Sequence, residues 1–231
     1  EKISIIDTKK ENNLSIHIAK SLPKNPTAAF HAVVNTPKRV ATACNHSATH
    51  LLHFALQQVL GSHVEQKGSL VNEDSLRFDF AHFQKMSAEE IQKTETIANN
   101  LIRQNLKLDE RRSVPIDDAR AMGAKALFGE KYGDHVRVIG YGDSVELCGG
   151  THVSATGNIG LVKIVSEGAI AAGIRRIEAI TGAKALEYID RKLALLDELS
   201  ESLKRPQDIK KAVDSMVAQN SELQKQVEAF S

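Results

Sequence analysis

Two pairs of potential metal ligands stand out in the sequence. His46 and His50 form the first pair, and Cys148 and His152 form the second, much later in the chain. Both pairs have the spacing i, i+4, which on a helix places two side chains on one face, roughly 5–6 Å apart at Cβ. Together they would offer three nitrogen atoms and one sulfur atom, a donor set that suits Zn²⁺. The spacing therefore predicts a zinc site where the two pairs meet.

The second pair is stronger evidence for a metal site than the first pair. With nine histidines in 231 residues, one i, i+4 pair of histidines alone would be weak evidence for a site. The second pair contains a cysteine and encloses Gly149 and Gly150, whose lack of side chains lets the backbone approach a bound ion closely. This combination favours a metal site over a helix face that carries ordinary histidines.

Two nearby residues offer alternative ligands. His53 lies one turn beyond His50 and can compete as a ligand of the ion. Such a residue more often supports the ligands through a hydrogen bond or simply packs in the core. Cys44 precedes the first pair and can be a ligand or a small buried hydrophobic residue, of which the second is the more usual. We expect both to lie outside the ligand set.

The composition indicates a folded chain that belongs in a reducing compartment. Hydrophobic residues make up 42% of the sequence, which is enough for a core, and the formal net charge is +1. A charge so near zero argues against a broad basic surface for duplex DNA, but not against a local basic patch. Two cysteines are too few for a secreted disulfide scaffold, so we expect a cytosolic protein. No apolar run approaches the roughly 20 residues that span a bilayer.

The elements that position the two pairs can be read from periodicity. Residues 1–45 are expected to be mostly extended, with Val33, Val34 and Val40 in strands and prolines breaking the segment. The first clear helix is expected over residues 46–60, with Gly61 ending it. Its apolar positions form one stripe, and the histidines occupy another.

The rest of the chain alternates between short strands and helices. Strands are expected over residues 69–71, 76–80, 111–116, 135–139, 144–147, 159–165 and 174–180, with a turn at 140–143. Helices are expected over 87–106, opened by a capping box, over 117–128, ended by Gly129, and over 183–204. This order predicts an α+β fold with a mostly antiparallel sheet, packed helices and a C-terminal helical extension.

The tail carries a hydrophobic heptad pattern. Apolar residues and one asparagine follow the spacing four, three, four, three at Ile209, Val213, Met216, Asn220, Leu223, Val227 and Phe230. About three heptads are the lower limit for predicting a coiled coil. A self-associating helix and a helix that packs on its own domain therefore remain as two open interpretations.

Several motifs together resemble one family. The segments are HSATHLLH, HVEQKGSLV, LRFDF, GEKYGDHVRV, LCGGTHV and AAGIRRIEAITG, in this order. They resemble the editing domain of alanyl-tRNA synthetases from about residue 40 to residue 185. The related editing domain of threonyl-tRNA synthetases shares the plan of two pairs of ligands, but its loop reads CRGPH where this chain has CGGTH. The resemblance implies the second-additional-domain fold that these two families share.

The resemblance also implies a reaction, the hydrolysis of serine or glycine wrongly esterified to tRNA(Ala). A pocket sized for alanine rejects these amino acids weakly, because a methyl or hydroxyl group changes binding by only about 1–3 kcal/mol. A second site that hydrolyses the wrong ester supplies the missing discrimination. In this family His46, His50, Cys148 and His152 would hold Zn²⁺. Four protein ligands are typical of structural zinc, so the role of the ion stays open between catalysis, substrate positioning and structure.

Further residues receive roles from the resemblance. Thr49 would contact the amino-acid side chain, although a threonine bonded to its own helix is the ordinary alternative. Gln66 would place water or substrate, and would otherwise be a surface residue. Arg175 and Arg176 would bind phosphates of the tRNA acceptor end, or else form salt bridges with Glu178 or another acid. Arg77 and Asp79, which share one strand face, would be a solvent-facing pair or help to shape the pocket.

The expected organisation is that of a fragment. The chain starts with Glu1 rather than methionine, and motifs of the ATP-dependent domain that attaches alanine to tRNA(Ala) are not found in it. The family's glycine-rich segment FYxExGGQ is not found either. We expect an editing domain over residues 1–182, incomplete at its N-terminal side, followed by a helical connector over 183–231.

The expected partner is the acceptor end of tRNA(Ala) carrying serine or glycine, with no membrane and no DNA. Two other functions remain open: a free-standing trans-editing hydrolase, and a zinc-stabilised module that binds the tRNA acceptor end without chemistry.

Overall fold

The structure, a computed structural model, describes residues 1–12, 14–126 and 132–229 and divides into two compact units. The first unit, Glu1–Asn35, holds a hairpin of β1 (Ile5–Glu11) and β2 (Leu14–Ala19), which pair antiparallel. The second unit, Thr36–Ser231, holds all the predicted site residues. The predicted domain boundary at residue 182 remains a prediction.

The helix that carries the first histidine pair is longer than predicted. α1 spans Thr36–Leu60, so the expectation of extended chain up to residue 45 is wrong from residue 36 onward. Pro37 lies in the first turn, where a helix tolerates proline because that N–H has no intrahelical partner. Val40 is helical, and Val33 and Val34 are in no strand. The predicted end is confirmed, since Gly61 has a φ of +113°.

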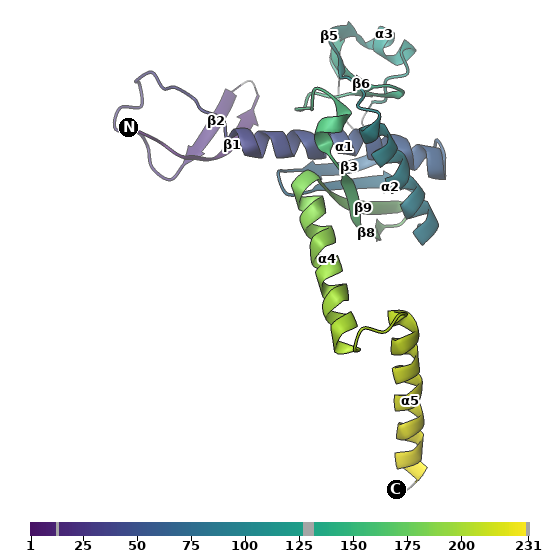
Figure 1. The fold of residues 1–231 in the computed structure, drawn as a ribbon. Helices are drawn as coiled ribbons and strands as arrows, with labels where there is room; N and C mark the ends of the chain where they lie inside the picture. The colour runs from purple at the N-terminus through teal and green to yellow at the C-terminus, as the bar shows by residue number, and fades with distance from the viewer. Residues whose placement is uncertain (13, 127–131, 230–231) are drawn as a thin grey trace. The chain divides into compact units, whose positions relative to one another are not determined.

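A four-stranded antiparallel sheet packs against α1. It consists of β3 (Gln66–Val71), β4 (Leu76–Ala81), β8 (Val162–Ala171) and β9 (Ile174–Thr181), in the order β3-β4-β9-β8. The alternation predicted for β4 is confirmed, because Leu76, Phe78 and Phe80 are buried together with the apolar face of α1 in the larger core. Figure 1 shows α1 lying across this sheet.

The helix α2 (Ala88–Arg103) lies beside α1 in the same core. Its predicted capping box is confirmed: the Ser87 N–H donates to Glu90 Oε2 at 2.7 Å, and the Glu90 N–H donates to Ser87 Oγ at 3.2 Å. The helix ends at residue 103, three residues before the predicted end.

A smaller antiparallel sheet has the order β5-β6-β7, formed by Asp109–Pro115, His135–Tyr141 and Ser144–Leu147. The turn between β6 and β7 is tighter than predicted, since Tyr141 pairs with Ser144, and Gly142 takes a φ of +60° that favours glycine. This sheet has its own small core with α3 (Ile116–Ala121), which is shorter than the helix predicted over 117–128. The predicted end at Gly129 lies outside the described residues.

Two helices complete the chain, α4 (Gly182–Ser202) and α5 (Ile209–Ala229). The helix predicted over 183–204 is therefore confirmed within two residues. In α5 no described residue is buried, and its heptad side chains, such as Met216 and Leu223, are exposed. Phe230 lies outside the described residues. None of the described helices is both long and apolar enough to cross a bilayer. The fold is α+β with antiparallel sheets, as predicted.

Candidate metal centre

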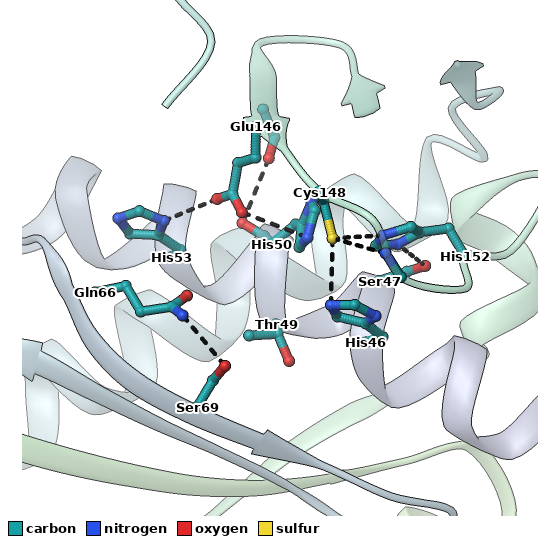
Figure 2. Close-up of polar contacts among 12 residues, drawn as sticks. His46, Ser47, Thr49, His50, His53, Gln66, Ser69, Glu146, Cys148 and His152 are labelled. Carbon is teal, nitrogen blue, oxygen red and sulfur yellow. Dashed lines mark hydrogen bonds and ion pairs between the residues drawn. The ribbon is translucent and has the colours of Figure 1, made fainter. Parts of the chain in front are cut away.

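The structure brings the four predicted ligands together. One donor atom from each of His46, His50, Cys148 and His152 lies within 4.8 Å of the others. Figure 2 shows the three imidazoles and the thiol pointing toward one another, between α1 and the segment that follows β7. His50 is buried, and the other three are half-buried. Among the described residues, these four form a group that could hold a metal ion.

Each pair is positioned by a different part of the fold. His46 and His50 lie one turn apart on α1, whose apolar face is anchored in the larger core. Cys148 comes directly after β7, and the loop that begins with it is held by Arg137. The Arg137 guanidinium donates from Nη1 to the carbonyl oxygens of Cys148 at 2.9 Å and Gly150 at 2.6 Å. The loop is therefore fixed through its backbone.

Two of the distances between donor atoms match the edges of a tetrahedral zinc site. Cys148 Sγ lies 3.5 Å from His46 Nε2 and 3.3 Å from His152 Nε2. Zn–N bonds of about 2.0–2.1 Å and a Zn–S bond of about 2.3 Å give nitrogen–sulfur edges of about 3.5 Å in a tetrahedron. The imidazole centroids are 4.5 Å apart for His46 and His152 and also for His50 and His152. The donor geometry therefore suits a single small cation.

The environment keeps the imidazoles neutral, which is the form that binds a metal. Burial and the neighbouring His50 lower the pKa of His46 to about 4. Burial, together with His50, His46 and Arg137, lowers the pKa of His152 to about 2. Burial also lowers the pKa of His50, against the opposing effect of Glu146. All three rings are therefore ready to donate a lone pair at neutral pH.

Two further observations fit an ion at this position. The Nδ1 atom of His50 is buried and has no hydrogen-bond partner among the described residues, a costly state that coordination would relieve. Gly150 lies so close to His46 that a Cβ there would be 1.9 Å from the ring carbon Cε1. The backbone therefore approaches the His46 imidazole more closely than any residue with a Cβ would allow.

A buried carboxylate behind the ligands was missed by the sequence analysis. Glu146 Oε2 lies 3.4 Å from His50 Nε2, and Oε1 lies 2.8 Å from His53 Nδ1. Burial alone would raise the pKa of Glu146, but the two histidines and Lys125 outweigh it and lower the pKa. The signal that could have found Glu146 is its place two residues before Cys148, because alternate residues of a strand share a face.

His53 therefore supports the site rather than joining it. Its ring hydrogen-bonds Glu146 and lies outside the cluster of donor atoms. This is the arrangement in which an outer carboxylate and its partners orient a metal-binding histidine. Cys44 is also outside the cluster; it is buried, and its thiol donates to the carbonyl of Asn158 at 3.4 Å.

Thr49 and Gln66 lie on the side of α1 that faces the four-stranded sheet, as Figure 2 shows. The Thr49 hydroxyl donates to the Asn45 carbonyl at 2.9 Å, which is the ordinary bond to its own helix that the sequence allowed. Gln66 Nε2 donates to Ser69 Oγ at 3.2 Å. Neither residue belongs to the group of donor atoms, and their catalytic roles remain predictions.

The two arginines proposed for tRNA are engaged in ion pairs. Arg175 is buried and paired through two nitrogens with Glu167, and Arg176 is paired through two nitrogens with Asp79, at 2.7 and 2.9 Å. Arg77 Nε lies 3.6 Å from Oδ2 of the same Asp79. Asp79 is 6% exposed, so its carboxylate does not face solvent. Binding of tRNA by Arg175 and Arg176 remains a prediction, and their bonds to acids fit the alternative.

The lowered pKa values of the histidines predict an acid-sensitive metal-free protein. His46 has a pKa of about 4 in the folded state and about 6.5 when unfolded, so the unfolded chain binds more protons between these values. Stability is therefore fully present above pH 6.5 and is lost as the pH falls toward 4. We expect the protonation of His46 to lower the free energy of unfolding by about 1–2 kcal/mol between pH 7 and pH 5.

Urea unfolding with a chelator present, at pH 7, 6 and 5, measures this loss. His46→Gln serves as the control, since its side chain does not titrate and its stability should fall less with acid. A midpoint of unfolding that stays constant from pH 7 to pH 5 in the unmodified protein would contradict the prediction.

Comparisons with known proteins agree with the motifs. A family profile described as "Threonyl and Alanyl tRNA synthetase second additional domain" matches residues 136–178. The alanine--tRNA ligase of Bacteroides fragilis is 58% identical over 230 residues, and that of Parabacteroides distasonis is 53% identical over 230 residues. The alanine--tRNA ligase of Cytophaga hutchinsonii is 53% identical over 232 residues. Each match covers 100% of this chain and 26% of the relative, so the chain spans about a quarter of their length.

Proposed function

Because this chain belongs to the alanine--tRNA ligase family by similarity along its whole length, we propose that it is the editing module of such an enzyme. In this proposal it hydrolyses the ester bond of Ser-tRNA(Ala) and Gly-tRNA(Ala), within a protein that attaches alanine to tRNA(Ala) using ATP. The observation that supports it best is the convergence of three imidazoles and one thiol within a chain of this family.

Zn²⁺ is the ion that we propose for the centre, with His46, His50, Cys148 and His152 as its ligands. Neutral imidazoles and one thiolate form a donor set typical of zinc. When bound, zinc would supply a Lewis acid that polarises the ester, holds the substrate's amino group or activates water. Glu146 would add a negative charge behind His50 and hold that ring in place.

Thr49 can supply selectivity for serine. Its hydroxyl proton is directed to the Asn45 carbonyl, so the oxygen is left to accept a hydrogen bond. A serine side chain can donate that bond, and an alanine side chain cannot. Gln66, whose amide donates to Ser69 Oγ, would place water or the substrate. In this proposal serine and alanine are told apart by one hydroxyl group. The site that attaches alanine to tRNA(Ala) discriminates poorly on such a small difference.

We propose that Arg175 and Arg176 lie near the acceptor end of the tRNA, that the module acts in the cytoplasm, and that the exposed apolar side chains of α5 serve self-association. A zinc-stabilised module that binds tRNA without chemistry is the second candidate, because four protein ligands leave no open position on a tetrahedral ion.

The test is hydrolysis of purified Ser-tRNA(Ala) by this protein, with a chelator and after zinc is restored. We expect release of serine that stops with the chelator and returns with zinc, while Ala-tRNA(Ala) used as the control substrate stays largely intact. Tight binding of Ser-tRNA(Ala) with no release of serine would overturn the hydrolase and favour the binding module. Equal hydrolysis of both esters would exclude an editing role.

A further inference from the structure

A chain of buried hydrogen bonds leads away from His152. Ser47 Oγ lies 3.1 Å from His152 Nδ1 and 3.2 Å from the hydroxyl of Tyr141, and that hydroxyl lies 2.5 Å from the carbonyl oxygen of Val153. The Val153 N–H donates back to Ser47 Oγ at 3.1 Å. Ser47 and Tyr141 are both fully buried. Figure 2 shows Ser47 beside the His152 ring on the side away from the thiol.

The direction of each bond follows from the last acceptor. A carbonyl oxygen can only accept, so Tyr141 must donate its single proton to Val153. The contact between the two hydroxyls is then a hydrogen bond only if Ser47 donates its proton to Tyr141. Ser47 has no second proton, so its contact with His152 requires the ring to donate from Nδ1. One arrangement of protons satisfies all three contacts.

From this chain we propose that Ser47 and Tyr141 are positioning residues that hold His152 as the tautomer protonated at Nδ1. The lone pair of that ring then lies at Nε2, the atom 3.3 Å from Cys148 Sγ. The inference deepens the proposed zinc site and rests on it, because it assigns how one ligand is prepared for the ion. It gives Tyr141, which reaches His152 through Ser47, an effect on metal binding.

The tautomer matters because only one of the two neutral forms can bind at Nε2. Burial raises the pKa of Tyr141, so the phenol keeps the proton that starts the chain. A wrong tautomer would place N–H where the ion must bind and would have to exchange before coordination.

The first test measures the tautomer directly in the metal-free protein. Nitrogen-15 NMR of the histidine rings distinguishes protonation at Nδ1 from protonation at Nε2, and His152→Gln assigns the signal. We expect Nδ1–H in the unmodified protein and a shift toward Nε2–H in Tyr141→Phe, where the freed Ser47 proton turns to the ring. A ring protonated at Nε2 in the unmodified protein, or a tautomer that Tyr141→Phe leaves unchanged, would overturn the inference.

The second test is the affinity for Zn²⁺ of Ser47→Ala, Tyr141→Phe and the double variant. We expect each single change to weaken binding by about 10–100-fold, the usual effect of removing a residue that supports a ligand. The double variant should bind no more weakly than Ser47→Ala, because Tyr141 acts through Ser47. Losses that simply add would show that the tyrosine acts through packing alone.

Tyr188→Phe in α4 is the matched control, since it removes the same hydroxyl from a tyrosine outside the chain of bonds, and it should bind zinc normally. Melting temperatures of the metal-free variants separate weaker binding from loss of fold. If the unmodified protein binds no zinc at all, the proposed metal site fails, while the NMR experiment still decides the tautomer.

Discussion

Replacing Gly150 with alanine should prevent the proposed zinc ion from binding, whereas replacing Gly149 should leave zinc binding unchanged. An added Cβ at residue 150 would lie 1.9 Å from Cε1 and 2.3 Å from Nδ1 of His46, far inside contact distance. At residue 149 an added Cβ would meet no atom within 4 Å. The two substitutions add the same methyl group to adjacent positions, so their difference isolates the contact with His46.

The loop cannot easily move aside to relieve this contact. Arg137 binds the carbonyl oxygens of Cys148 and Gly150, and α1 is anchored in the larger core. The imidazole of His46 must therefore rotate away, which removes one donor. We expect bound zinc to fall from about one ion per chain to a small fraction, with affinity at least 100-fold lower.

Metal analysis after dialysis, together with a titration against a competing chelator, checks this prediction. Gly149→Ala should match the unmodified protein in both measurements. Normal zinc content in Gly150→Ala would show that His46 does not hold the ion from its present position.

Replacing His50 with alanine should abolish zinc binding and the proposed hydrolysis of Ser-tRNA(Ala). This change removes a donor and leaves the carboxylate of Glu146, 3.4 Å from the lost ring, buried with one partner fewer. His53→Ala is the matched comparison one turn along the same helix. It removes a hydrogen bond of 2.8 Å to Glu146 but no donor atom of the cluster, so we expect about tenfold weaker zinc binding with metal still present.

Zinc content and serine release, measured on both variants at the same zinc concentration, separate the two roles. The ratio of zinc bound to serine released should stay constant in His53→Ala if the histidine acts only through the ion. Full zinc occupancy in His50→Ala would remove this residue from the ligand set. Complete metal loss in His53→Ala would instead make it a ligand.

The sequence predicted that His46, His50, Cys148 and His152 would lie together more accurately than it predicted where the first helix begins. The i, i+4 spacing identified His46 and His50 without any knowledge of where the helix begins. The helix begins earlier than predicted because Pro37, which would interrupt the interior of a helix, is tolerated in its first turn. The capping box at Ser87 and the glycine at 61 were reliable because each has a local physical cause.

Contacts between residues far apart in the chain could not be predicted from the sequence, for a physical reason. Which acid pairs with Arg175 depends on how β8 and β9 are aligned, and that alignment includes two irregularities that one sequence does not disclose. Glu146 presents the same difficulty, since its partners His50 and His53 lie on another element. The chain of bonds through Ser47 and Tyr141 likewise joins α1 to β6. Periodicity predicts on which face of an element a side chain lies, but not which residues of other elements it contacts.

The two halves of the proposed metal centre come from different elements far apart in the chain, α1 and the loop after β7, although Cys148 packs against the same larger core as α1. His46 and Cys148 are 102 positions apart, one on a helix of the larger core and the other at the end of the small sheet. An ion bound between them would act as a removable cross-link, closing a long loop much as a disulfide does, but without needing an oxidising compartment. The loop after β7 would then be held to α1 more firmly when zinc is available.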